Sequence, residues 1–213
     1  MTENVSLVDI SGKAEEIMAY CARVSSNNQN NPEYAGLLKY CAEHDHWSVF
    51  EMANMNLEIN TSRAISAQIL RHRSFCFQEF SQRYQSIDDS GVIFYTARRQ
   101  DTKNRQNSVD DLSEDVKIEW DARQQQHWRA SHKHYQWALD NEIAKECARM
   151  VLPLQTATRM YMNGTIRSWI HYIELRTGNG TQLEHKVLAD EAKEIFCREL
   201  PIVAKALGWL GSE

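Results

Sequence analysis

Residues 68–84 read QILRHRSFCFQEFSQRY and join the end of a predicted helix to a run of charged and polar side chains. Gln68, Arg71 and His72 stand at positions i, i+3 and i+4, so a helix would place them on one face. Arginine offers a planar fork that suits phosphate and carboxylate groups, and it stays charged when partly buried. A plainer interpretation remains open, because cations are also favourable at the solvated C-terminal end of a helix.

The residues that follow alternate in a way that suits an extended segment. Glu79, Ser81 and Arg83 are two residues apart, so in an extended chain their side chains would face the same way. Together they offer an acceptor, a hydroxyl group and a cation, a set that suits the base, sugar and phosphate of a nucleotide. We therefore expect a nucleotide-binding face here, with Arg71 and Arg73 reaching anions on different sides of the chain.

Hydrophobic periodicity on either side of this stretch predicts an α+β fold. From Glu51 to Asn60 apolar and polar residues alternate, which predicts a half-buried strand, and Thr61 or Ser62 can cap a helix that runs to about His72. Residues 78–110 lack periodicity and predict a long loop with one or two short strands. Helices are expected over residues 13–24, 33–44, 112–142, 144–152, 167–175 and 181–199 and after Pro201, and further strands over 5–10 and 156–163. We expect one domain, residues 1–213, with a central mixed or antiparallel sheet and surrounding helices.

The composition suits a folded domain in a reducing compartment. The 213 residues are 42% hydrophobic and 25% charged, which allows a sizeable core and excludes disordered and collagen-like classes. No run of about 18 apolar residues predicts a membrane span, and residues 1–10 lack the pattern of a signal peptide. The five cysteines have no CxxC spacing. We therefore expect a cytoplasmic protein with mostly buried thiols, and Cys76 stays open as a nucleophile.

The net charge of −5 conceals two basic stretches. Residues 63–83 contain four arginines and one glutamate, and residues 145–176 contain four arginines, one lysine and two glutamates, so each stretch carries a net charge of +3. The remaining 160 residues carry −11. In an acidic protein, two such stretches are expected to come together around an anion.

The opening stretch also carries a family signature. RHR at Arg71–Arg73, followed by seven residues and Ser81, resembles the RHRx7S motif of the flavin-dependent thymidylate synthases, the ThyX family. Four further segments resemble motifs of that family: ARVS at residues 22–25, HWSVFE at 46–51, ARMVLP at 148–153 and RSWIHYIELR at 167–176. The resemblance keeps the family's order, covers roughly residues 10–205 and is weakest over 86–145.

The resemblance implies a ThyX-like fold and a homotetramer whose active sites lie where subunits meet. Members of the family convert dUMP to dTMP, a methyl transfer in dTMP biosynthesis. They take the one-carbon unit from 5,10-methylenetetrahydrofolate and hydride from FAD that NADPH has reduced. The ligands dUMP, FAD, NADPH and 5,10-methylenetetrahydrofolate are all anionic, which would account for the two basic stretches. We expect FAD as cofactor, NADPH and 5,10-methylenetetrahydrofolate as co-substrates, and no nucleic-acid or membrane partner.

The family positions assign candidate site residues by resemblance. Arg176 matches the position that activates the pyrimidine. The dUMP-contacting positions correspond to Gln68, Arg71, Glu79, Phe80, Ser81, Gln82, Arg83, Arg149 and Arg176. The FAD-contacting positions correspond to Ser48, Arg71, His72, Arg73, Glu79, Thr165, Arg167 and His171. Three positions depart from the family pattern: Gln78 and Thr165 stand where asparagine is commoner, and Met52 where histidine is common.

The residue types favour activation of dUMP by a cation rather than by a nucleophile. Ser81 has no adjacent histidine and carboxylate pair in the sequence to activate it. An arginine beside the pyrimidine stabilises the negative charge that ionisation at N3 places on the ring, and it keeps its own proton. We therefore expect Arg176, which precedes the TGNG break at 177–180 and so projects from a helix end, to activate dUMP, and Ser81 to bind it.

Other functions stay open at this point. A nucleic-acid-binding module would use the basic stretches and form a salt-sensitive complex without flavin. A flavoprotein that keeps the scaffold without synthase activity is a second alternative. No metal is expected, because the HxH pairs at 44/46 and 132/134 fall in or beside predicted helices, where residues i and i+2 diverge. The tryptophans at 120, 128 and 137 are expected to pack as part of a helix.

Overall fold

Two nine-residue strands form the centre of the fold in the computed structural model, which describes residues 2–88 and 91–211. β2 (Asn54–Ser62) pairs with β6 (Ala157–Thr165) along their full length in antiparallel register. β1 (Asn4–Ile10) pairs with β2, and β3 (Cys76–Glu79) pairs with β6. The strand order is therefore β1-β2-β6-β3, and every neighbouring pair is antiparallel. The sequence predicted a mixed or antiparallel sheet, and the sheet is antiparallel.

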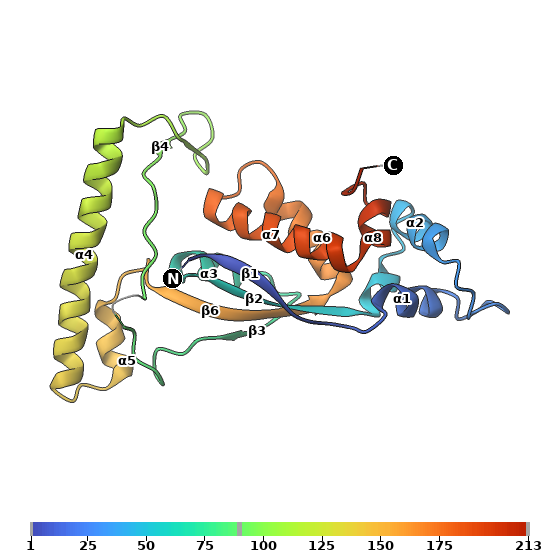
Figure 1. Cartoon of the computed structure of the whole chain (residues 1–213), viewed down its shortest axis with the longest axis horizontal. Coiled ribbons are helices and arrows are strands. Elements are labelled where there is room, and N and C mark those ends of the chain that lie inside the picture. Colours follow the sequence, from blue (N-terminus) through green and yellow to red (C-terminus); the bar gives the residue numbers. More distant parts are fainter. Residues whose placement is uncertain (1, 89–90, 212–213) are drawn as a thin grey trace.

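The alternation predicted for β2 places its apolar residues in the core. Met55, Leu57 and Ile59 are fully buried, and Met160 and Met162 of β6 lie beside them. Three helices cover this side of the sheet: α3 (Arg63–Ile69), α6 (Ile166–Thr177) and α7 (Leu183–Glu199), as Figure 1 shows. Three of the largest buried side chains, Trp169, Tyr172 and Phe196, come from α6 and α7.

The remaining elements gather at the two ends of the sheet (Figure 1). One end carries α1 (Ala14–Ala22), α2 (Ala35–Glu43), the 3-10 helix η1 (Trp47–Glu51) and α8 (Pro201–Ala206). The other end carries the long helix α4 (Glu114–Asp140), α5 (Lys145–Ala148) and the 3-10 turn η2 (Arg149–Val151). Between β3 and α4 lies a small hairpin of β4 (Arg99–Gln100) and β5 (Ser108–Val109).

Every helix and strand that periodicity predicted is present, with ends shifted by a few residues. The 3-10 helix η1 was not predicted, and α3 ends at Ile69, three residues before the predicted end. The predicted loop at 78–110 holds the end of β3 and the β4–β5 hairpin. Residues 89 and 90 of that loop lie outside the described residues, as do residues 1, 212 and 213 of the predicted single domain.

Two expectations about side-chain burial need correction. Cys76 and Cys147 are exposed, so the thiols are not mostly buried; Cys41 is buried and the other two lie between these extremes. Of the three tryptophans in α4, Trp128 is buried, while Trp120 and Trp137 are about half exposed or more. A 27-residue helix that contacts the rest of the chain along one face leaves its other faces in solvent, which periodicity alone does not reveal.

None of the helices in the described part of the chain is long and apolar enough to cross a membrane.

A close approach between β6 and the core makes Gly164 a sensitive position. A Cβ atom added at Gly164 would lie 2.6 Å from Cε1 of Phe75, whose ring packs edge-on against Trp169 and Tyr172. We expect Gly164→Ala to lower the free energy of unfolding by about 1–3 kcal/mol, because the ring must leave its place.

Urea unfolding checks this expectation. Gly36→Ala is the matched control, because nothing lies within 4 Å of the added Cβ and Gly36 sits in α2. Alanine is the better helix former, so this control should gain about 0.5–1 kcal/mol. Equal unfolding midpoints for the two variants would show that Phe75 is free to move.

Candidate active site

Each central strand continues directly into a helix, and this arrangement brings two helix ends together. Ser62 accepts a hydrogen bond from the N–H of Ile65 (3.4 Å) at the start of α3, and Thr165 accepts one from Ser168 (3.2 Å) at the start of α6. Because the strands are antiparallel, α3 and α6 begin at opposite ends of the sheet. Helices of seven and twelve residues are about 10 and 18 Å long, so the two together nearly match the roughly 30 Å length of a nine-residue strand. Their C-terminal ends therefore meet over the sheet.

His72 and Arg176 are in contact at this meeting point. Nε of Arg176 donates a hydrogen bond to Nε2 of His72 over 2.9 Å. A guanidinium group can only donate, so Nε2 of His72 is the unprotonated nitrogen and its proton sits on Nδ1. Burial, followed by the positive charge of Arg176, lowers the pKa of His72 to about 4. His72 is therefore neutral at physiological pH, and it holds the Arg176 guanidinium by one edge.

The surroundings of this pair are aromatic and polar. The His72 ring stands edge-on to Tyr172 of α6, with ring centroids 4.9 Å apart. Gln68, one turn before His72, donates a hydrogen bond from its amide to Gln182 at the start of α7 (2.7 Å). Residues of both basic stretches, 63–83 and 145–176, thus meet here, as the charge pattern predicted.

A second region gathers unpaired hydrogen-bond donors. Gln82 and Arg149 line a hollow of about 300 Å³ together with Arg63. Four buried side-chain atoms of the described residues lack a hydrogen-bond partner, and two of them, Nε2 of Gln82 and Nε of Arg149, belong to residues of this hollow. A buried donor without a partner costs free energy. Two such donors beside an arginine therefore indicate a place for an anionic or carbonyl group.

The carboxylate of Glu79 has two partners within the chain. It forms an ion pair with Arg63 (2.8 Å) and accepts a hydrogen bond from Thr158 (3.0 Å). The side chain of Glu79 is only 15% exposed. In this arrangement Glu79 fixes Arg63 at the rim of the hollow that holds Gln82.

A third region unites two of the sequence motifs. Arg167 and His171, one turn apart on α6, line a hollow of about 480 Å³ with Trp47, Ser74 and other residues. Glu51 of the HWSVFE segment forms an ion pair with Arg167, and Ser168 donates to the carbonyl of Ser74 (3.3 Å). The remaining lining residues are Glu51, Ser168, Ile170 and Glu174. The hollow thus joins η1, the turn after α3, and α6.

The expectation that Glu79, Ser81 and Arg83 face one way is wrong. β3 ends at Glu79, and the chain turns at residues 82–84. Oγ of Ser81 accepts a hydrogen bond from the backbone N–H of Arg83 (3.4 Å), which stabilises this turn. The turn points Arg83 toward solvent, where it lies 3.4 Å from Glu146, and both side chains are more than half exposed.

The other predicted residues have fewer contacts. Arg71 and Arg73 are exposed, and their side chains have no hydrogen bond or ion pair to other described residues. Ser48 is exposed in η1, and Phe80 lines a separate hollow of about 310 Å³. The hydroxyl of Thr165 caps α6 and also lies 3.1 Å from Oγ of Ser168. Within residues 2–88 and 91–211, no group of three or more metal-ligating side chains could hold a metal ion.

One chain therefore does not bring all predicted positions into one pocket. Gln82 and Arg149 share one hollow, Arg167 and His171 share another, and Gln68, His72 and Arg176 form a third group. Sequence reasoning missed four residues that hold these groups in place: Arg63, Gln182, Glu184 and His185. Arg63 was visible only as one charge of a basic stretch, and the three others lay in a helix that showed only an amphipathic pattern.

Comparisons with known proteins place the chain in a family. A sequence model of the family described as thymidylate synthase complementing protein matches residues 6–202. A probable flavin-dependent thymidylate synthase of Paramecium bursaria Chlorella virus 1 is 57% identical over 199 residues, 92% of each chain. A flavin-dependent thymidylate synthase of Synechocystis is 54% identical over 195 residues, 92% of this chain and 90% of that protein.

A solved structure has the same fold at low sequence identity. The UMP/dUMP methylase PolB from Streptomyces cacaoi, crystallised with 5-Br dUMP, superimposes with a TM-score of 0.87 over 99% of this chain and 96% of PolB, at 24% identity. The fold, the order of the motifs and the two relatives above half identity agree with one another. The chain therefore belongs to the flavin-dependent thymidylate synthase family.

Proposed function

We propose that the chain is a methyltransferase that converts dUMP to dTMP in the cytoplasm, with FAD as cofactor, NADPH as reductant and 5,10-methylenetetrahydrofolate as one-carbon donor. The observation that carries the proposal is the contact between Arg176 and His72, because it holds a permanent cation at the end of α6 where the family positions its pyrimidine activator. Membership of the flavin-dependent family supports the flavin, and the dUMP analogue named for PolB supports the pyrimidine nucleotide.

Arg176 has the chemistry that activation of a pyrimidine needs. Its Nε is taken by His72, and its two terminal nitrogens have no hydrogen bond to other described residues. Those nitrogens form the part of the guanidinium fork that binds a flat acceptor in two places. Placed against the pyrimidine, the fork stabilises the negative charge that develops on the ring and gives up no proton, since arginine stays protonated.

His72 has a positioning part in this proposal. A neutral imidazole accepts a hydrogen bond from Arg176, whereas a protonated one would repel it. Because the pKa of His72 is lowered to about 4, the accepting form persists throughout the neutral range. The orientation of Arg176 is therefore independent of pH above that value.

The hollow of Gln82 and Arg149 is suited to the dUMP anion. Two arginines and no acidic residue stand among its described lining residues, and two of its donors are buried without partners. An anionic nucleotide would satisfy both donors and repay the cost of their burial. Gln68, Arg71, Phe80, Ser81 and Arg83 are proposed as further dUMP contacts, and Glu79 as a contact to dUMP and FAD.

The hollow of Arg167 and His171 is suited to part of FAD. Arginine and histidine donors suit the cofactor's phosphates, and Trp47 offers an aromatic wall. Ser48, Arg71, His72, Arg73 and Thr165 are proposed as the other FAD contacts. Bound and reduced, FAD would supply the hydride, and the chain's residues would orient it against the pyrimidine.

A homotetramer would unite the three groups that one chain keeps apart. The proposal places each active site where subunits meet, so that one subunit contributes the hollow of Arg149 and another contributes Arg176. Exposed apolar side chains support such contacts: Met150 is 73% exposed, Leu154 71% and Ile118 66%. Light scattering should then give about four times the 24.8 kDa of one chain.

The experiment that tests the proposal is direct. We expect the purified protein to be yellow, with a flavin absorption band, and to release tritium from dUMP labelled at C5. If dTMP is formed, tritium release should require both NADPH and 5,10-methylenetetrahydrofolate. Two reactions, each lacking one of these compounds, are the controls. A colourless protein that binds nucleic acid in a salt-sensitive way would refute the proposal. A yellow protein that forms no dTMP would refute the proposed activity, while flavin binding would still stand.

A further inference from the structure

Two titratable side chains at the start of α7 are buried although the chemistry above does not use them. Glu184 is 7% exposed and His185 is fully buried. Burial of a carboxylate and an imidazole is costly unless each is paired or neutral. Both lie next to Gln182, the residue that contacts Gln68.

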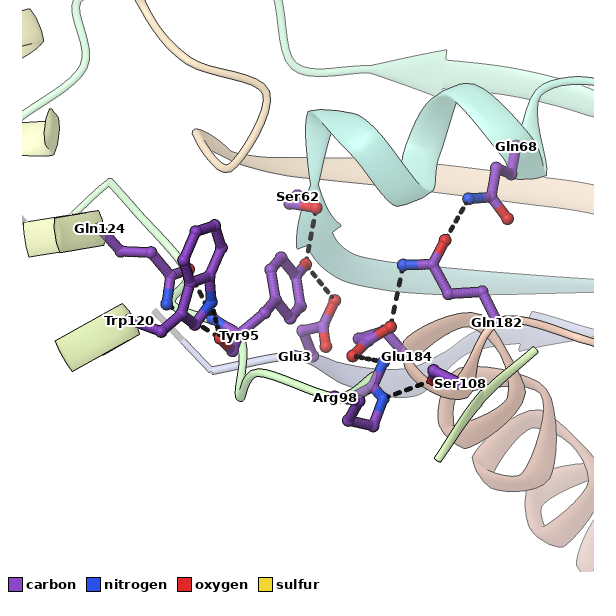
Figure 2. Close-up of polar contacts among 10 residues, drawn as sticks. All are labelled: Glu3, Ser62, Gln68, Tyr95, Arg98, Ser108, Trp120, Gln124, Gln182 and Glu184. Carbon is purple, nitrogen blue, oxygen red and sulfur yellow. Dashed lines mark hydrogen bonds and ion pairs between the residues drawn. The ribbon is translucent and has the colours of Figure 1, made fainter. Parts of the chain in front are cut away.

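These residues belong to one continuous chain of hydrogen bonds. Arg98 donates from Nη2 to Oε1 of Glu184 (2.6 Å), and Gln182 donates to Oε2 of the same carboxylate (2.9 Å). Gln68 donates to Oε1 of Gln182 (2.7 Å), and Figure 2 shows this part from Arg98 to Gln68. Oε1 of Gln68 then lies 3.4 Å from Nδ1 of His185. Nε2 of His185 lies 3.1 Å from the hydroxyl of Tyr172.

The ion pair between Arg98 and Glu184 sets the direction of every bond. An ionised carboxylate only accepts, so Gln182 must present its N–H to Glu184 and its carbonyl oxygen to Gln68. Gln68 must then present its N–H to Gln182 and its own oxygen to His185. No amide along the chain is free to flip without losing two hydrogen bonds.

The same direction continues through His185. Because Oε1 of Gln68 accepts, Nδ1 of His185 must carry the proton, and Nε2 accepts from the Tyr172 hydroxyl. Burial, with the charge of Arg176 as a smaller cause, lowers the pKa of His185 to about 3. His185 is therefore neutral, as a single fixed tautomer requires.

Both ends of this chain of hydrogen bonds are anchored in the fold. Arg98 also donates from Nε to Oγ of Ser108 (2.8 Å), and three residues earlier the Tyr95 hydroxyl lies 2.6 Å from Ser62 Oγ and 2.9 Å from Glu3, contacts that Figure 2 also shows. At the other end, Tyr172 packs against His72, which holds Arg176.

We propose that Gln182, Glu184 and His185 are positioning residues that hold the Gln68 amide in one orientation for dUMP. Arg98, through its ion pair with Glu184, fixes the donor-to-acceptor direction of these hydrogen bonds. The amide of Gln68 has two N–H donors and two oxygen lone pairs. One of each is used by Gln182 and His185, so one donor and one acceptor remain to meet a carbonyl and an N–H of the pyrimidine nucleotide. The inference rests on the proposed dUMP contact of Gln68.

A double-mutant cycle tests the proposal. We expect Gln68→Ala and Gln182→Ala each to raise the KM for dUMP about five- to tenfold, with kcat changing less. Since Gln182 is proposed to act through Gln68, adding Gln182→Ala to Gln68→Ala should raise KM by less than about twofold. Effects that multiply in the double variant would overturn the proposal, because Gln182 would then act independently of Gln68.

A matched pair of substitutions tests the role of His185. The amide nitrogen of asparagine falls near the place of Nδ1, and that of glutamine near the place of Nε2. We expect His185→Asn to keep the donor to Gln68 and a KM within about threefold of the original. We expect His185→Gln to raise KM about five- to tenfold. The reverse order contradicts the proposal, and flavin retention and the unfolding midpoint check that both variants fold.

The outcomes separate this inference from the proposed function. A Gln68→Ala variant with unchanged KM for dUMP would remove both the dUMP contact of Gln68 and its positioning chain, while leaving the synthase activity in place. A raised KM in Gln68→Ala with a multiplicative Gln182→Ala effect would remove the positioning chain alone. If neither His185 variant folds, the cycle between Gln68 and Gln182 still decides.

Discussion

Arg176→Ala is expected to lower the rate of dTMP formation at saturating dUMP by roughly 10²–10³-fold, while flavin remains bound. The variant loses the cation that donates a hydrogen bond to His72, and with it the charge proposed to face the pyrimidine. Arg167 and His171, which are proposed FAD contacts, line a separate hollow that the substitution leaves unchanged. Tritium release and the flavin absorption band measure the two effects on one sample.

Two further variants sharpen this prediction. Arg176→Lys keeps the charge but loses the planar fork, so we expect it to recover only a small part of the rate. Arg123→Ala removes an exposed arginine of α4 and should leave the rate unchanged. The charge of Arg176 also lowers the pKa of His72, so that pKa should rise in Arg176→Ala and be visible by NMR titration.

Normal turnover in Arg176→Ala would refute the activator role. A covalent dUMP adduct in the original protein that disappears in Ser81→Ala would instead point to a nucleophile. The structure gives Ser81 a backbone amide as hydrogen-bond partner, which is the environment expected of a binding or turn residue.

Arg149→Ala is expected to raise the KM for dUMP by about 10- to 100-fold and to change kcat much less. A hydrogen bond to a charged group contributes about 1.5–3 kcal/mol, which sets this range. Nε of Arg149 is buried without a partner in the chain, so its proposed partner is the nucleotide. Because Arg149 is not expected to contact the reacting atoms, its removal weakens binding before it slows the reaction.

Steady-state kinetics with dUMP as the varied substrate check this split. Arg149→Lys should recover part of the affinity through charge alone, and Arg123→Ala again serves as the surface control. A KM unchanged in Arg149→Ala, or changed equally in Arg123→Ala, would refute the contact. A loss of kcat with unchanged KM would move Arg149 from binding to the reaction itself.

The elements of the fold were predictable because their signals are local. Alternation from Glu51 to Asn60 identified β2, and a hydroxyl at Thr61 or Ser62 was expected to cap the next helix, which Ser62 does. The resemblance of ordered motifs then named the family, which the comparisons confirm. The strand order was not predictable, since β2 and β6 pair across about a hundred residues and no local pattern specifies a partner at that distance.

The candidate site was predictable as a set of residue types and only partly as an arrangement. The two basic stretches do meet, and Arg176 does project from the end of α6. The turn after Glu79 was not foreseen, because the alternation of residues 79–83 reads equally well as a strand. The roles of the site residues in dUMP and FAD binding stay predictions.

By itself, the sequence determined which residues form helices and strands, where the cations lie along the chain and which family the motifs resemble. The tertiary structure decided which of those residues share a surface. His185 shows the physical reason: along the chain it is one of eight histidines, and only the packing of α7 against α3 and α6 places its ring between Gln68 and Tyr172. Once it is there, burial makes it neutral, and a carboxylate two hydrogen bonds beyond Gln68 settles which nitrogen holds its proton.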